Sequence, residues 1–186
     1  MLLNALDFGG IVAVTAIAAI HQASMLHLAT LGGFLAMAVY AALSDAANFR
    51  IPNFTSIGIV ALFPLYLLTS PITVAWLAAV AVAGAVFLVG LVLFARGWAG
   101  GGDIKFISAV ALWAGPSLIV PFLVIMGLAG GVLAVGALVF QSARRFRTDG
   151  SLCIVSLAQI SERPKIPYGI AIAAGAVYVG VRLLID

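Results

Sequence analysis

Carboxylates are the main candidates for proton chemistry in this chain, because only 8% of its 186 residues are charged. Two of the six acidic residues lie near the termini, and two lie in a polar segment, 141–165, where water solvates charge at little cost. The other two, Asp45 and Asp103, each stand at the boundary of a long apolar run. The full set is Asp7, Asp45, Asp103, Asp149, Glu162 and Asp186. Asp45 and Asp103 are therefore the candidate site.

Together, Asp45 and Asp103 would suit hydrolysis of a peptide bond. Two carboxylates held close together can share one proton, since like charges at short range resist being ionised together. The ionised carboxylate then acts as a general base on water, while the protonated one donates to the scissile carbonyl. Each also has a simpler explanation: Asp45 as a solvated carboxylate after a helix, and Asp103 as a helix N-cap. Asp45 follows an expected helix C-terminus, where the helix dipole disfavours negative charge.

Three consecutive glycines, Gly100 to Gly102, directly precede Asp103. Residues without side chains let an extended peptide approach the backbone, and they adopt positive φ values easily. A flexible hairpin between two helices would use the same glycines. A phosphate-binding loop is disfavoured, because the Gly-Lys-Ser/Thr ending of that motif is absent.

The composition predicts the surroundings of this site. The chain is 65% hydrophobic, with a mean hydropathy of +1.26, as expected of a polytopic helical membrane protein. Nucleic acid binding would need a dense basic face, which the sequence lacks. A single cysteine, Cys153, excludes an internal disulfide and a Cys-based zinc site. We therefore expect an all-α bundle in the membrane, without a metal or cofactor.

Six apolar runs predict six core transmembrane helices, each about long enough to cross the bilayer core. The expected spans are Met25–Leu43, Phe54–Thr69, Thr73–Ala95, Ile104–Ala114, Ser117–Phe140 and Pro167–Ile185. Residues 1–24 hold a shorter apolar stretch, Phe8–Ile20, without the preceding positive charge of a signal peptide. We interpret it as an extra N-terminal membrane helix, either in the interface or crossing as a seventh span. The chain then divides into segment 1–24 and membrane domain 25–186.

The basic residues predict the orientation, because Lys and Arg in short loops stay on the cytoplasmic side. If the first span exits into the cytoplasm, every basic residue except Arg182 lies on that side. This topology places Asp45 and Asp103 at the same, cytoplasmic face. The arginines of loop 141–165 are expected to contact anionic membrane lipids.

Three ordered motifs carry a resemblance to a known family. They are Asp45 with Arg50-Ile51-Pro52-Asn53, then Gly100-Gly101-Gly102-Asp103-Ile104-Lys105 as G-x-G-D-x-K, then Pro167-Tyr168-Gly169-Ile170-Ala171-Ile172. With these motifs the chain resembles the prepilin peptidases, membrane aspartic proteases of peptidase family A24. It is most similar to the short CpaA/TadV-like forms that act on Flp, or tight-adherence, pilins. The resemblance covers about residues 26 to 185.

The resemblance implies the site residues by position. They are Asp45 and Asp103 as the catalytic pair, Gly100 and Gly102 as motif glycines, and Lys105, Pro52 and Asn53 in support. Lys105 would support the site electrostatically, although it is equally explained as a positive-inside anchor. Pro52 is also an ordinary residue for a first helical turn.

The resemblance also implies a substrate: a prepilin with a short basic leader ahead of a hydrophobic helix. Cleavage would occur at the cytoplasmic face of the bacterial inner membrane, without a cofactor. Longer family members carry an N-terminal domain with paired cysteines that binds zinc and accompanies N-methylation of the pilin. That domain is not present in this sequence, so methyltransferase activity is not expected. The oligomeric state is left open.

Two other classes of protein remain as alternatives. A proton-coupled transporter would also hold acids among membrane helices, but near the bilayer midplane. A non-catalytic membrane subunit of a secretion or pilus machine would tolerate loss of either aspartate. Among proteases, presenilin-like enzymes also use G-x-G-D, but they cut inside a transmembrane span.

Overall fold

The structure is a computed structural model that describes residues 3–149 and 167–185, with side chains described for 24–140 and 167–185. These residues form five helices and contain no strand, which confirms the all-α prediction for the described part of the chain. The helices are α1 (Leu3–Asn48), α2 (Asn53–Thr69), α3 (Trp76–Ala95), α4 (Gly101–Asp149) and α5 (Tyr168–Ile185).

Helix α1 is continuous over residues that the sequence suggested were two elements. The expected break after the Phe8–Ile20 stretch does not occur, and the proposed boundary between residues 24 and 25 falls inside the helix. The segment His21-Gln22-Ala23-Ser24 holds no glycine or proline, so nothing in it interrupts the backbone hydrogen bonds. A separate N-terminal helix is therefore not confirmed.

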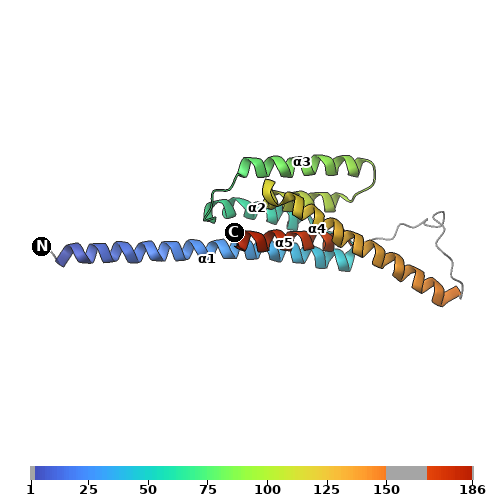
Figure 1. Cartoon of the computed structure of the whole chain (residues 1–186), viewed down its shortest axis with the longest axis horizontal. Coiled ribbons are helices and arrows are strands. Elements are labelled where there is room, and N and C mark those ends of the chain that lie inside the picture. The colour runs from blue at the N-terminus through green and yellow to red at the C-terminus, as the bar shows by residue number, and fades with distance from the viewer. Residues whose placement is uncertain (1–2, 150–166, 186) are drawn as a thin grey trace.

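Helix α4 contains the expected fourth and fifth spans. Its backbone is non-helical at Gly115, where φ is 56° and ψ is −167°. Glycine reaches this positive φ at little cost, and Pro116 follows it directly. The chain reverses direction there (Figure 1), so residues before and after the turn line the same pocket. The helix also continues to Asp149, so residues 141–149 of the predicted polar loop are helical, while 150–165 lie outside the described residues.

Among the described residues, four helical segments are long and apolar enough to cross a membrane: Ser24–Asn48, Trp76–Ala95, Gly101–Phe140 and Tyr168–Ile185. The predicted count of six spans is not confirmed. The segment Gly101–Phe140 counts as one span although its backbone breaks at Gly115, and the 17 residues of α2 span only about 26 Å at 1.5 Å per residue. The chain is a multi-pass membrane protein.

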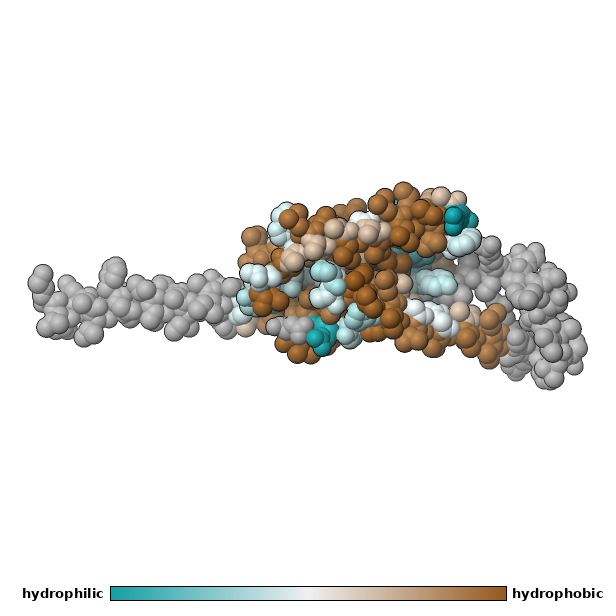
Figure 2. Space-filling view, turned by 45° about the horizontal axis from the view of Figure 1, so that its top comes forward, coloured by the Kyte–Doolittle hydropathy of each residue, from teal (hydrophilic) through white to brown (hydrophobic). Residues whose placement is uncertain are grey.

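The surface agrees with lipid as the surrounding solvent. Apolar residues dominate the coloured face of the molecule in Figure 2. In α3 only Ala79 and Gly90 are buried, while Leu88 and Val89 are each 63% exposed. Exposed apolar area on this scale is unfavourable in water but not in a bilayer.

An aromatic cluster joins α1, α2 and the first half of α4. Phe34 stacks on Trp113 with ring centroids 4.4 Å apart, and Tyr66 lies 5.0 Å from Trp113. The Trp113 indole N–H also donates to the Ile59 carbonyl oxygen at 2.9 Å, which satisfies its one polar group in the core. These contacts fix three helices relative to one another.

The helices bring segments that are distant in the sequence to one end of the bundle. The end of α1 and the starts of α2, α4 and α5 lie at this end (Figure 1). The α2–α3 connection and the turn between the two halves of α4 lie at the other end. The first of these ends holds the candidate site.

Candidate active site

Asp45 and Asp103 line one pocket of about 450 Å³. The end of α1 supplies Asp45, and the first turn of α4 supplies Asp103. The other residues that line this pocket are Phe49, Arg50, Ile51, Gly100 and Gly102. The two carboxylates are close enough to interact electrostatically. We call this space the aspartate pocket.

Asp45 is only 6% exposed, so it is not the solvated loop carboxylate of the simpler explanation. Its Oδ2 accepts a hydrogen bond from the backbone N–H of Gly169 at 2.6 Å. Gly169 lies in the first turn of α5, where backbone N–H groups have no partner within the helix and the dipole is positive. The start of α5 thus offsets the unfavourable position of Asp45 at the end of α1.

Gly169 must be a glycine for this contact to form. A Cβ built there would lie 2.7 Å from the Asp45 Cβ and 2.9 Å from its Oδ2, closer than real Cβ atoms approach. Gly169 was not among the site residues that sequence reasoning named. The signal was present in the Pro167-Tyr168-Gly169 motif, to which no role had been given.

Asp103 lies within the first turn of α4, because that helix begins at Gly101. It is therefore not the N-cap residue that the sequence suggested as its simpler role. Its carboxylate reaches back to the backbone of Gly100, in the manner of an acidic residue in a capping box. Half-buried in the wall of the aspartate pocket, it remains available to a ligand there.

The link between α1 and α2 turns sharply beside Asp45. The Phe49 N–H donates to the Asp45 carbonyl oxygen at 2.8 Å, and Phe49 itself has a φ of 51°. The Ser44 hydroxyl donates to the Arg50 carbonyl oxygen at 3.0 Å. A non-glycine residue at positive φ is uncommon and persists where the surrounding contacts fix it. This turn places Arg50 and Ile51 on the wall of the aspartate pocket.

Lys105 does not line the aspartate pocket. Its Nζ donates to Asn53 Oδ1 at 3.1 Å, and both residues line a separate groove of about 850 Å³ between α2, α3 and the first half of α4. Residues two apart on a helix do not share a face, so Lys105 and Asp103 point in different directions. Pro52 stands just before α2, and its carbonyl oxygen accepts from the Thr55 hydroxyl at 2.7 Å. The three supporting residues therefore organise the start of α2.

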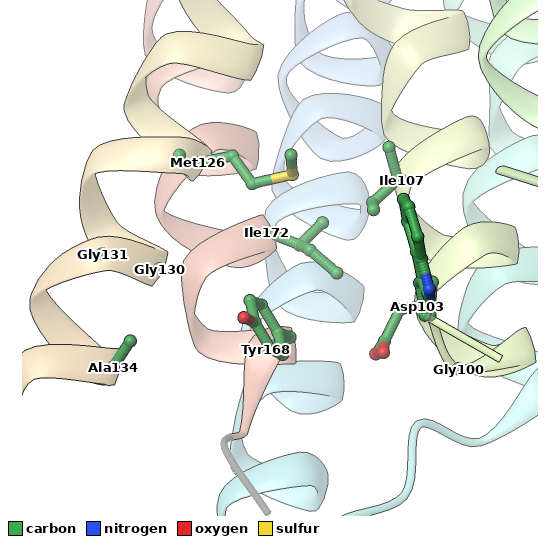
Figure 3. A pocket seen from close by; sticks show the side chains of 12 residues that line it. Gly100, Asp103, Ile107, Met126, Gly130, Gly131, Ala134, Tyr168 and Ile172 are labelled. Atoms are coloured by element: carbon green, nitrogen blue, oxygen red, sulfur yellow. The ribbon is translucent and has the colours of Figure 1, made fainter. Parts of the chain in front are cut away.

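A second pocket, of about 430 Å³, opens on the other side of Asp103. Asp103 and Gly100 line both spaces. Figure 3 shows Asp103 and Ile107 on one side of this space, Gly130, Gly131 and Ala134 of the second half of α4 on the other, and Tyr168 of α5 between them. Ile107, Met126 and Ile172 make its walls apolar. We call it the apolar groove.

Fold and site together define a multi-pass helical membrane protein with paired carboxylates in one pocket at the end of its bundle. The model of the type IV leader peptidase family matches residues 32–135, more than half of the chain, including Asp45 and Asp103. The chain belongs to this family, which confirms the predicted resemblance to prepilin peptidases and makes the protein a peptidase by family. Comparisons with curated proteins and with solved structures gave no significant match.

Proposed function

We propose that the protein is an aspartic endopeptidase that removes the leader from type IV prepilins, with Asp45 and Asp103 as its catalytic pair. One observation carries the proposal: two carboxylates from helices that are distant in the sequence line one pocket in a member of a leader peptidase family. The Gly169 N–H would hold Asp45 in a fixed orientation, and Asp103 would face the substrate.

Hydrolysis by this pair needs no other group. One carboxylate, ionised, takes a proton from water as the water oxygen attacks the scissile carbonyl carbon. The other, protonated, donates its proton to the carbonyl oxygen. When the tetrahedral intermediate collapses, the C–N bond breaks and the leaving amine takes the proton that the first carboxyl had received. As the C=O bond re-forms, a hydroxyl of the intermediate returns a proton to the second carboxylate. The pair returns to its starting state with one shared proton.

The proposed place of cleavage is the cytoplasmic face of the bacterial inner membrane. The distribution of basic residues supports this side, since all except Arg182 fall there in the predicted topology. Both aspartates lie at the end of the bundle, whereas a proton-coupled transporter would hold them near mid-span. We further propose a CpaA/TadV-like specificity for Flp-type prepilins, without methylation of the product.

Co-expression with a candidate prepilin in a bacterial membrane tests the proposal. The substrate carries a basic leader, a glycine before the cut and an apolar helix. We expect a faster-migrating product whose N-terminus, read by mass spectrometry, is unmethylated and begins at the start of the apolar helix. A cut inside that helix would instead indicate presenilin-like activity. An intact prepilin would favour a transporter or a non-catalytic subunit.

The two motif glycines give a matched pair of substitutions. A Cβ at Gly100 would lie 2.9 Å from Asp103 Oδ2, whereas one at Gly102 would lie 3.6 Å from Ile51 Cβ, an ordinary contact. Because Gly100→Ala displaces the carboxylate, we expect it to lower the cleavage rate by about 10-fold or more, and Gly102→Ala by less than about 3-fold. Rates of leader removal in vesicles, normalised to enzyme amount, measure the difference. Equal losses in both variants would contradict this account of Gly100.

A further inference from the structure

We infer that the apolar groove binds the hydrophobic helix of the substrate, on the side of the scissile bond away from the leader. The inference rests on the proposed function and assigns that substrate a surface. The groove lies between the two halves of α4 and the start of α5 (Figure 3). Its occupant is a single apolar helix whose first turn lies beside Asp103.

The apolar groove adjoins the aspartate pocket. Asp103 and Gly100 line both spaces, so a chain that passes from one to the other runs past the Asp103 carboxylate. Gly100 carries no side chain to obstruct this path. The scissile bond would then lie at the junction, and the segments on its two sides would occupy different spaces.

The two spaces also differ in chemistry. The aspartate pocket presents two carboxylates, which complement a basic leader, and Arg50 also lines its wall. The groove beyond Asp103 is lined by apolar side chains such as Ile107, Met126 and Ile172. A peptide bound across the junction must therefore be polar and basic on one side of the cut and apolar on the other.

The floor of the groove is shaped for a close helix contact. Gly127 and Gly131 are one turn apart on the same face of α4, and a Cβ at either would meet no atom within 4 Å. Small residues four apart let the backbone of a second helix approach closely within a membrane. Gly130, between them, packs toward Tyr168, with its ideal Cβ 3.5 Å from that ring. A helix lying on this face would thus reach Tyr168 and Asp103 together.

Two substitutions on the same helix test the groove by kinetics. Gly131→Leu fills it, whereas Gly136→Leu places the same side chain at an open position outside it. Both replace glycine with a better helix former, so neither should unfold α4. With full-length enzyme in proteoliposomes and the prepilin described above, we expect Gly131→Leu to raise KM by about 10-fold, with a smaller change in kcat, and Gly136→Leu to change either constant by less than about 2-fold. An unchanged KM in Gly131→Leu would overturn the inference.

Cross-linking tests the binding of the substrate helix in the apolar groove without relying on turnover. Cys153→Ser and Asp103→Asn provide a cysteine-free, inactive background, into which Gly131→Cys or Gly136→Cys is introduced. The prepilin carries one cysteine in the first two turns of its apolar helix. We expect an enzyme–prepilin disulfide at position 131 and little at 136. Equal cross-linking at both positions, or a 131–131 link between two copies of the enzyme that excludes the prepilin, would overturn the inference.

The failure of this inference is distinguishable from failure of the proposed function. If the unmodified enzyme leaves the prepilin intact, the proposed function is wrong and the groove loses its assigned occupant. If the enzyme cleaves normally but Gly131→Leu does so equally well, the peptidase assignment stands and only the groove assignment fails.

Discussion

Asp45→Asn and Asp103→Asn will each reduce leader cleavage by at least about 1,000-fold, because the one carboxylate that remains cannot act as both general base and general acid. The amide has the same shape as the carboxylate, and the amide oxygen at position 45 can still accept from the Gly169 N–H. We therefore expect both variants to stay folded. The double variant should be no worse than either single one, since residues that act as a unit have non-additive effects.

The measurement is the amount of processed prepilin after co-expression, with quantities of enzyme matched by immunoblot. Thermal unfolding in detergent checks that the variants fold like the parent. Asp7→Asn, an acid near the opposite end of α1, serves as the control and should cleave normally. Retained cleavage in both single variants would remove Asp45 and Asp103 from the catalytic site.

Gly169→Ala will lower kcat by about 100-fold while KM changes little, because the added methyl group moves Asp45 and not the substrate. The new Cβ would approach the Asp45 Cβ to 2.7 Å, and neither atom belongs to a flexible chain end that could move aside. Either α5 shifts or the carboxylate turns, and both changes break the 2.6 Å hydrogen bond. Gly169 is thus a positioning residue that acts through Asp45.

Gly84→Ala is the matched control for Gly169→Ala, since a Cβ at Gly84 meets nothing within 4 Å. Purified enzymes in proteoliposomes give kcat and KM, and thermal unfolding reports on the fold. A loss confined to thermal stability, with kcat intact at low temperature, would make Gly169 a packing residue only. A rise in KM alone would place it in substrate binding instead.

The local sequence predicted most of the helices and the two candidate acids. Hydropathy is a property of each segment, so the apolar runs 54–69, 73–95 and 167–185 match α2, α3 and α5 to within a few residues. The same property left few charges to consider, which made Asp45 and Asp103 stand out. The short, local motifs indicated the family, and the match of the family model to residues 32–135 showed it.

The continuity of α1 was harder to predict, because it depends on the absence of a backbone break. The polar group after Ile20 marked a change of composition, but it contains no residue that ends a helix, and α1 runs through it. At Gly115 the backbone does break, as the Gly115-Pro116 pair predicted, and the two expected spans are the two halves of α4 on either side of this turn. Composition indicates which segments partition into lipid. It does not indicate whether the backbone hydrogen bonds of a helix continue from one segment into the next.

The sequence by itself determined an all-helical membrane protein, its two candidate acids and its family, since these depend on residue types and local spacing. Only the tertiary structure decided what each side chain meets. It set the Gly169 N–H against Asp45 across 124 positions, turned Lys105 away from Asp103 toward Asn53, and opened an apolar groove beside Asp103. The physical reason is that hydrogen bonds and cavities depend on the relative placement of helices, which packing fixes and local pattern does not.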